Sequence, residues 1–381
     1  MMGAKAGDNA QLLALAEALG WPFEAKHVAY RRTELLTNLF AGPTLAGLDR
    51  RRSDPLEPPW PDLILSAGRR NEPLVRWIAR QAGRDNVRLV HVGRPWALHE
   101  CFDLIVTTPQ YRLPDKPNIL HNEAPMHRVR RERLDAEARA WAPRLAHLPF
   151  PRIAVVMGGN AGPYSFDREN GALLGFVASG RARAKGGSLL VTTSARTPKA
   201  AIEGLEAGLS APAFVYRWTK GAKENPYFAF LALADEIVVT SDSMSMLIEA
   251  AATGKPVRLF DLDRRQGSHR PHLPADGSVP PRTLKERLEG FSLRPAIYKL
   301  GMRLGPSRLT RDVSIIHRNQ VAAGRASWLG QEGGAVPSPP PLADTERAAA
   351  AVRRLFEEPR PPRPRVAPSP VPEWLRRLTQ G

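Results

Sequence analysis

At 381 residues, the chain is too long for one hydrophobic core and suits two domains of about 150 residues each, with extensions. Hydrophobic residues make up 43% and charged residues 24%, and no apolar run approaches the roughly 18 to 20 residues of a membrane helix. We therefore expect a globular protein that does not span a membrane. Its single cysteine, Cys101, excludes an internal disulfide and a cysteine-rich metal cluster.

The charge balance predicts an affinity for anions. Lys and Arg number 55 against 38 Asp and Glu, a formal net charge of +17 that would attract nucleotide phosphates, nucleic acid or an anionic lipid surface. The composition that a GC-rich genome imposes explains the same excess of Arg without any ligand. Aromatic residues do not alternate with the Arg clusters as a base-stacking surface would require, so we expect no nucleic-acid partner.

Two features bear on location. The chain start, 1–11, lacks the apolar core of a signal peptide, which predicts a cytoplasmic protein. The stretch 282–330 mixes Lys and Arg with apolar side chains and would suit a peripheral position on the anionic inner membrane. A helix packed on its own domain explains that stretch equally, and nothing in the pattern predicts an oligomeric state.

Alternating apolar runs predict a first α/β domain, residues 1–149. Gly-rich polar loops open its helices 12–19 and 74–82. The charged stretch 123–148 is expected to be helical and ends in several prolines, so we place the domain boundary after it. The strand expected before the first helix is missing or cut short, because only two residues precede Gly3. The strands are predicted at 62–66, 87–92, 104–108 and 118–120.

The second domain, 150–334, repeats this architecture. Its strand-like runs alternate with helices, which predicts a parallel sheet covered on both faces. A Pro-rich tail, 335–381, contains one helix, 344–357, with Asp344 as its expected N-cap. The strands are predicted at 153–157, 188–193, 214–216, 236–240 and 257–260.

The segment 234–257 carries the strongest functional signal. A buried strand ends at Thr240, and unpaired amides at the start of the next helix, with the positive end of its dipole, would bind phosphate. Glu249, two helical turns in, could accept the two hydroxyls of a ribose, whereas ordinary helix capping explains the Ser and Asp cluster without a ligand. The candidate residues are Ser241, Asp242, Ser243, Ser245 and Glu249.

Two other strand ends would open on the same edge of the sheet, where parallel α/β sheets bind ligands. Gly158 and Gly159, followed by Asn160, would let amides approach an anion, and a tight structural turn is the alternative. Arg196 follows the next strand and could pair with a phosphate, although a solvated surface Arg fits equally. We assign these residues to the same nucleotide or phosphate site.

The order of these motifs resembles known families. The segment 234–257 is similar to the donor-nucleotide unit of GT-B glycosyltransferases such as the peptidoglycan N-acetylglucosaminyltransferase and the lipid A and Kdo transferases, in which the matching glutamate binds ribose. With Met157-Gly-Gly-Asn, Thr193-Ser-Ala-Arg and Asn225-Pro-Tyr-Phe, the chain resembles the mitochondrial-fission ELM (elongated mitochondria) family. The resemblance implies an α/β fold of GT-B type, two Rossmann-like domains facing a cleft with a basic helical C-terminal extension, and adds Asn225 to the nucleotide site.

The resemblance also implies two alternative functions. As a metal-independent inverting glycosyltransferase, the protein would bind a nucleotide-sugar as substrate, without a cofactor, and transfer the sugar to an envelope or lipid-linked acceptor. As a non-catalytic scaffold, it would recruit partners at a membrane surface. Val257 stands where retaining GT-B enzymes have a second glutamate, so a retaining mechanism is disfavoured.

The loops that open the two helices of the first domain would supply the acceptor side. The catalytic residue stays unknown: Asp8 is one candidate, a plain helix cap is the alternative, and the histidines are unranked. We read Asp261-Leu-Asp263 as a strand-end loop rather than a metal site. The unranked histidines are His91, His99, His121 and His127. The acceptor-side candidates are Lys5, Asn9, Arg69 and Asn71.

Overall fold

The computed structural model describes residues 1–31, 42–162, 164–263, 269, 271, 311–331 and 341–359. The chain divides into two compact units: unit 1 is Met1–Arg128 with the segment from Ala343, and unit 2 is Val129–Leu342. This division differs from the predicted one, which separated the domains after residue 149 and left 335–381 as a tail. Most of the basic stretch 282–330, with its predicted membrane role, lies outside the described residues.

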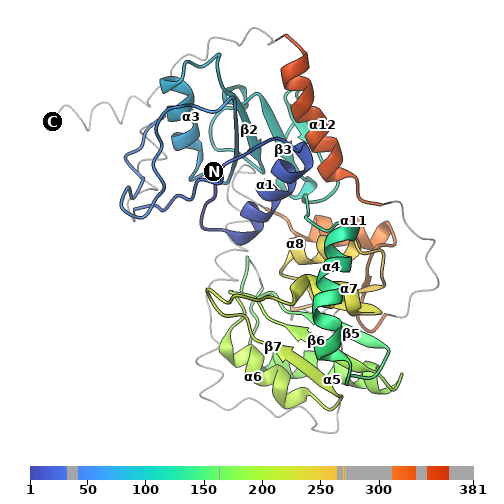
Figure 1. Cartoon of the computed structure of the whole chain (residues 1–381). Helices are drawn as coiled ribbons and strands as arrows, with labels where there is room; N and C mark the ends of the chain where they lie inside the picture. Colours follow the sequence, from blue (N-terminus) through green and yellow to red (C-terminus); the bar gives the residue numbers. More distant parts are fainter. Residues whose placement is uncertain are drawn as a thin grey trace, which may run out of the picture. The chain divides into compact units, whose positions relative to one another are not determined.

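Unit 1 is built on a four-stranded parallel sheet in the order β1-β2-β3-β4. Helices α1 (Ala6–Leu19) and α12 (Asp344–Glu357) cover one face, and α3 (Glu72–Gln81) covers the other (Figure 1). Val90 faces α1 and α12 whereas Leu89 faces α3, the alternation that buries both sides of a strand. The four predicted strands are confirmed as β1 (Leu63–Ala67), β2 (Arg88–Val92), β3 (Leu104–Thr107) and β4 (Ile119–His121).

The chain start lies beside this sheet. Met2 forms one parallel bridge with His27, and the Met1 ammonium donates to the Leu65 carbonyl oxygen at 2.9 Å. The strand that the sequence left missing or cut short is therefore represented by a single bridge. The first helix follows directly, with Lys5 in the N-cap position.

The last described helix, α12, completes unit 1. A stripe of Ala and Val on α12 is buried with α1 in one hydrophobic cluster. The Asp344 carboxylate accepts hydrogen bonds from the backbone N–H groups of Glu123 at 2.8 Å and Ala124 at 3.1 Å. Ala343, not Asp344, therefore takes the N-cap position. The predicted helix over 123–148 forms only over Arg131–Trp141, as α4, and the amides of Glu123 and Ala124 bind α12 instead.

Helix α4 belongs to unit 2, which explains why the observed boundary precedes the predicted one. Trp141 packs edge-on against Phe214 and Phe230, at 6.3 and 6.4 Å between ring centroids. The Arg133 guanidinium lies 3.7 Å from the centroid of the Phe228 ring in α7 (Tyr227–Leu233). These ring contacts hold a mostly charged helix on unit 2.

Unit 2 contains a six-stranded parallel sheet in the order β10-β9-β8-β5-β6-β7, the strand order of nucleotide-binding Rossmann sheets. The order reverses between β5 and β8, and ligands of such sheets bind outside the carboxyl ends of the strands at that point. The five predicted strands are confirmed, and the two-residue β10 lacked a sequence signal. The strands are β5 (Arg152–Val156), β6 (Ser188–Thr192), β7 (Ala213–Tyr216), β8 (Glu236–Thr240), β9 (Val257–Phe260) and β10 (Ser327–Trp328).

Several shorter elements complete the two units. Among its described residues, unit 2 also has helices α5 (Arg168–Arg183), α6 (Lys199–Gly208), α8 (Met244–Ala251) and α11 (Ser314–Ala322). Single 3-10 turns are η1 (His99–Cys101), η2 (Pro109–Tyr111) and η3 (Ala142–Leu145). Within the described ranges, no helix is both long and apolar enough to cross a bilayer.

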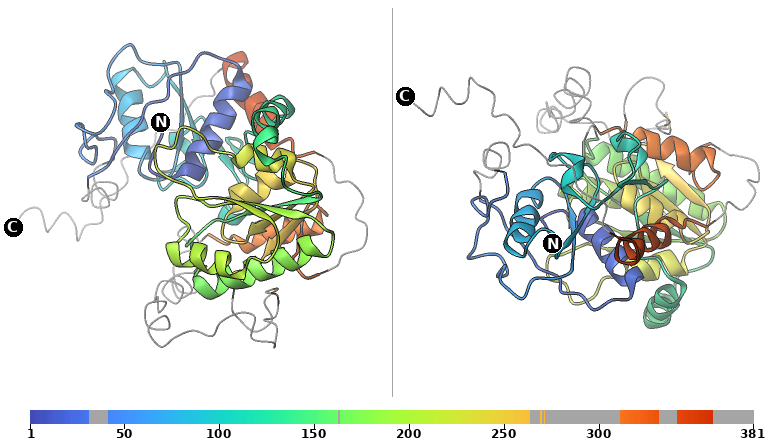
Figure 2. Two further views of the ribbon diagram at one scale, coloured as in Figure 1. Left: turned by 60° about the horizontal axis from the view of Figure 1, so that its bottom comes forward. Right: turned by 90° about the horizontal axis from the view of Figure 1, so that it is seen from above.

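Glycines bring α5 and α6 into backbone contact on one face of the unit 2 sheet (Figure 2). A Cβ atom added to Gly204 would lie 2.0 Å from the Arg168 carbonyl oxygen, and one on Gly171 would lie 2.1 Å from the Ala201 carbonyl oxygen. No side chain fits at such distances, so only glycine allows this helix spacing. Because α6 begins just after the loop that ends at Thr197, the contact also fixes the position of that loop.

Candidate functional site

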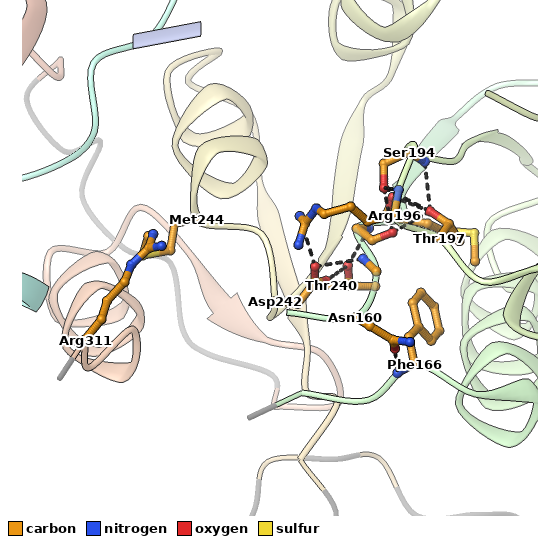
Figure 3. A network of polar contacts seen from close by, with 12 residues as sticks. Asn160, Phe166, Ser194, Arg196, Thr197, Thr240, Asp242, Met244 and Arg311 are labelled. Atoms are coloured by element: carbon orange, nitrogen blue, oxygen red, sulfur yellow. Dashed lines mark hydrogen bonds and ion pairs between the residues drawn. The ribbon is translucent and has the colours of Figure 1, made fainter. Parts of the chain in front are cut away.

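The candidate nucleotide residues gather where β5, β6 and β8 end. Figure 3 shows Asn160, Arg196 and Asp242, which follow these three strands, close together at the carboxyl edge of the unit 2 sheet. The reversal of strand order between β5 and β8 lies at the same place. The three strand ends converge at one edge of the sheet, as predicted, while the contacts below differ from those that the sequence implied.

Asp242 is the centre of this arrangement. Its carboxylate is fully buried and accepts from the Gly159 N–H at 2.7 Å and from the Thr240 hydroxyl at 2.7 Å. The Arg196 guanidinium lies 3.3 Å from the same carboxylate, and its own side chain is 45% exposed. Burial raises the pKa of Asp242 to about 6, and Arg196 with the Gly159 amide acts in the opposite direction.

The amides of the two glycines after β5 donate to Asp242 and to its neighbour Thr240. The sequence assigned their amides to a ligand, but the Gly158 N–H donates to the Thr240 hydroxyl oxygen at 2.8 Å and the Gly159 N–H donates to Asp242. A Cβ on Gly158 would lie 2.2 Å from an Asp242 oxygen, and one on Gly159 would lie 2.0 Å from the Arg196 carbonyl oxygen. Glycine is therefore required here by packing within the protein.

Arg196 projects from a loop that is fixed by hydroxyl groups. The Ser194 hydroxyl donates to the Gly158 carbonyl oxygen at 2.8 Å, and the Thr197 hydroxyl donates to the Met157 carbonyl oxygen at 3.2 Å. The Ser194 N–H closes the loop on the Thr197 hydroxyl oxygen at 2.8 Å. The sequence placed Ser194 at this strand end but did not predict that the Ser194 and Thr197 hydroxyls hold the base of the loop while the guanidinium stays partly exposed.

The start of α8 lacks a side-chain cap. Ser243 is the N-cap residue and makes no capping hydrogen bond, whereas the Ser241 hydroxyl is buried and accepts the Leu262 N–H at 3.1 Å. Ser245 lies in the first turn and is partly exposed. Arg311 places a guanidinium nitrogen 3.8 Å from the Met244 sulfur at this helix start. No sequence signal connected Arg311 with residues 67 positions earlier.

Glu249 is held by a tyrosine. The Tyr227 hydroxyl donates to the Glu249 carboxylate at 2.5 Å, and burial together with this negative neighbour holds the pKa of Tyr227 well above its usual value. Glu249 is 8% exposed. The other two amide candidates support backbone instead: Asn225 accepts the Tyr227 N–H at 3.0 Å, and Asn160 accepts the Phe166 N–H at 2.7 Å.

In unit 1, two of the acceptor-side candidates support the backbone. Asn71 is 1% exposed and donates to the Met1 and Ala67 carbonyl oxygens at 3.1 and 3.0 Å. Asn9 makes two hydrogen bonds to the Gly3 backbone, at 2.9 and 2.8 Å.

The other two acceptor-side candidates keep their charged groups near the surface. The Arg69 guanidinium lies 4.4 Å above the centroid of the Trp96 ring. The exposed Lys5 ammonium lies 3.9 Å from the carboxylate of Asp8, the candidate base. Lys5 and Arg69 thus interact through their charged groups, whereas Asn9 and Asn71 bond to backbone groups.

A buried glutamate in unit 1 escaped the sequence reasoning. Glu72 is 3% exposed and accepts the N–H groups of Trp96 at 2.9 Å and Ala97 at 2.8 Å. Burial raises the pKa of Glu72 to about 7, against the effect of those amides. An acidic residue in the first turn of a helix, such as Glu72 in α3, is ordinarily explained by the helix dipole. The sequence therefore did not predict the bonds of Glu72 to the amides of Trp96 and Ala97.

The candidate histidines lie in different surroundings. Burial lowers the pKa of His91 to about 3, so this ring is neutral and bonded to the Ser66 hydroxyl at 3.1 Å. Burial also lowers the pKa of His99. His121 lies 3.1 Å from the exposed Asp115 carboxylate. The backbone N–H of His127 donates to the Thr345 hydroxyl at 3.2 Å. His91 is therefore unsuited to act as a base near neutral pH.

The Asp261-Leu-Asp263 segment is a turn. The Asp261 carboxylate accepts the N–H groups of Asp263 at 2.9 Å and His269 at 3.0 Å. In the part of the chain that the structure describes, no group of three or more His, Cys, Asp or Glu side chains is arranged to hold a metal ion.

A family model described as Mitochondrial fission ELM1 matches residues 6–276. The chain belongs to the mitochondrial fission ELM1 family. Mitochondrial fission protein ELM1 of Arabidopsis thaliana is 28% identical over 230 residues, which cover 53% of this chain and 52% of that protein. Uncharacterized protein RP120 of Rickettsia prowazekii (strain Madrid E) is 25% identical over 230 residues, 52% of this chain and 64% of that protein. The ELM1 family member described here thus spans about half to two thirds of these relatives, and the resemblance seen in its motifs is confirmed.

Solved structures similar to this ELM1 family member include a MurG and a UDP-GlcNAc 2-epimerase. Acinetobacter baumannii MurG is 12% identical with a TM-score of 0.39, covering 93% of this chain and 98% of that one. The UDP-GlcNAc 2-epimerase of Methanocaldococcus jannaschii is 10% identical with a TM-score of 0.44, again covering 93% and 98%. The predicted α/β class with parallel sheets is confirmed by the strand order and pairing in both units. Such TM-scores assign no ligand to the chain.

Proposed function

We propose that unit 2 binds the diphosphate of a nucleotide-sugar at the carboxyl edge of its sheet, between the start of α8 and Arg196. The observation that carries this proposal is an uncapped helix start beside a guanidinium that the protein itself holds in place. The first amides of α8 and the positive end of its dipole favour a negative group. The exposed side of Arg196 can donate to phosphate oxygens in the same place.

The ligand enters at α8 and not at the glycine turn. In a dinucleotide-binding Rossmann unit, the pyrophosphate lies on the glycines after the first strand and on the helix that follows. Here the Asp242 carboxylate fills the glycine turn, and the start of α5 is capped by Asp167, which accepts the Asn170 N–H at 3.0 Å. These contacts disfavour a dinucleotide and direct a diphosphate to the β8–α8 turn.

Glu249 is assigned to the ribose. It lies on α8 beyond the phosphate-binding turn, and its carboxylate is of the acceptor type that the two hydroxyls of a ribose require. The tyrosine hydroxyl also fixes the carboxylate, so little side-chain entropy is lost when a ribose binds. Sugar transfer to an acceptor near Lys5 and Arg69 in unit 1 extends the same proposal, with Asp8 as the candidate base.

The test is a thermal-shift and calorimetric screen of uridine and guanosine diphosphate sugars. A ligand at 100 times its Kd adds about 2.7 kcal/mol, which corresponds to roughly 5 to 10 °C for a unit of this size. Glu249→Gln should weaken binding about tenfold or more, since a hydrogen bond to a charged group is lost. Glu224→Gln is the control, because that exposed carboxylate pairs with Arg144 on the surface.

The outcomes separate the two functions. Binding that depends on Glu249 and not on Glu224 supports the nucleotide site. If no nucleotide-sugar binds at millimolar concentration, the site is wrong, and the non-catalytic scaffold becomes the better hypothesis for this fold.

A further inference from the structure

The Asp242 carboxylate is surrounded by hydrogen-bond donors of the kinds that bind anions. Its oxygens take one backbone amide, one hydroxyl and one guanidinium, the donor types that otherwise bind phosphate. The residue is 6% exposed and its side chain is closed off from solvent. A diphosphate at the start of α8 would therefore meet Arg196 already paired with an internal negative charge.

We propose that Asp242 is a specificity-determining residue that holds Arg196 and couples anion binding at the start of α8 to the uptake of one proton. The inference rests on the proposed function of the same site. With the carboxylate charged, Arg196 is neutralised by its partner and an incoming anion is repelled. With the carboxyl neutral, the full charge of Arg196 becomes available to the ligand.

The hydrogen-bond geometry allows that proton to be placed. Gly159 and Arg196 both donate to one Asp242 oxygen, so the proton goes to the other oxygen, Oδ1, which faces Thr240. The Thr240 hydroxyl donates to Oδ1 in the charged state and can turn to accept the proton, since an oxygen that also accepts the Gly158 N–H has a second lone pair. Turning the buried Thr240 hydroxyl breaks the hydrogen bond that it donates to Oδ1, and protonation carries that cost.

The Asp242 carboxylate occupies the space that Gly158 leaves, since an added Cβ would lie 2.2 Å from Oδ1. Contacts with Gly159, Thr240 and Arg196 hold the carboxylate there, so protonation is the response available to it. Among the described residues, Arg196 is the charged side chain that faces the carboxylate. The carboxyl titrates near pH 6 in the free protein, whereas the nearby His317, whose pKa burial lowers to about 4, stays neutral above pH 5.

The experiment uses two probes whose charge is constant between pH 5.5 and 7.5. UDP-N-acetylglucosamine is a diphosphate diester, and sulfate tests the anion site without a nucleotide. Wild-type protein should bind each about tenfold more tightly at pH 5.5 than at pH 7.5, if the bound carboxyl titrates more than one unit above the free one. Titration calorimetry in two buffers should show uptake of roughly half a proton or more near pH 6.5.

Asp242→Asn resembles the protonated carboxyl and should bind both probes at pH 7.5 as tightly as the wild type does at pH 5.5, without pH dependence. Asp135→Asn, an exposed aspartate of α4 in the same unit, should keep the wild-type profile. The proton count on wild-type protein decides the question even if the Asp242 variant does not fold.

The possible outcomes distinguish the role of Asp242 from the proposed nucleotide site. Sulfate binding with proton uptake, but no binding of the nucleotide-sugar, supports the role of Asp242 and refutes this nucleotide as the ligand. Nucleotide binding without pH dependence or proton uptake refutes the role of Asp242 and leaves the proposed function standing. No binding of either probe overturns both.

Discussion

Replacing Gly204 by Ala tests how closely α5 and α6 must pack. In an exposed helix the change would stabilise the protein by about 0.5 to 1 kcal/mol, because glycine is the poorer helix former. Here the new Cβ would lie 2.0 Å from the Arg168 carbonyl oxygen, a backbone atom that cannot turn away. The helices must separate by more than 1 Å, since ordinary contacts begin near 3.4 Å. Overpacking costs typically 1 to 3 kcal/mol, so the net expectation is a loss of about 1 to 2 kcal/mol.

Urea unfolding monitored by tryptophan fluorescence measures this loss as a lower midpoint of the unit 2 transition. Gly180→Ala is the matched control, because Gly180 also lies within α5 and nothing is found within 4 Å of an added Cβ. The two variants should shift the midpoint in opposite directions. Equal stabilisation by both would refute the close helix contact and, with it, the fixed position of the Arg196 loop.

Three further predictions concern single buried groups. Lys255→Met should cost about 1 to 3 kcal/mol in urea unfolding, because the Lys255 ammonium binds three carbonyl oxygens at the end of α7. The raised pKa of Glu72, about 7, makes its contribution to stability greatest below pH 4.5 and removes it as the pH rises to 7. The unfolding free energy of the wild type should therefore fall by up to about 1.4 kcal/mol per pH unit in this range, and that of Glu72→Gln should lack this fall. Asp344→Ala should lower the unfolding free energy of unit 1 by about 1 to 3 kcal/mol, because the buried Ala124 amide and the part-buried Glu123 amide lose their acceptor.

The strands were predictable because each is short, apolar and closed by polar or Gly-containing segments. β8 ends at Thr240 and β9 at Phe260, as the sequence indicated, since buried parallel strands read as continuous apolar runs. The place of α12 was not predictable. Its buried stripe consists mainly of alanine, and its anchoring contact joins Asp344 to amides more than 200 residues earlier.

The sequence indicated at which edge of the unit 2 sheet the candidate residues gather, but not which of their side chains pair there. Strand ends at Gly158, Arg196 and Asp242 follow from the alternation of strands and helices, and their convergence follows from a parallel sheet. That Asp242 would occupy the glycine turn depends on side-chain directions across three loops, which no local pattern encodes. The same limit hid Glu72, whose partners are backbone amides and carry no residue-specific signal.

The interruption of unit 1 by unit 2 has a consequence during protein synthesis. About 200 residues are translated between Arg128 and α12, which takes roughly 10 to 40 s at 5 to 20 residues per second. Unit 2 has been translated before α12, which covers one face of the first sheet together with α1, has been made. During that interval the nascent first unit leaves an apolar surface uncovered, so chaperone binding should concentrate there.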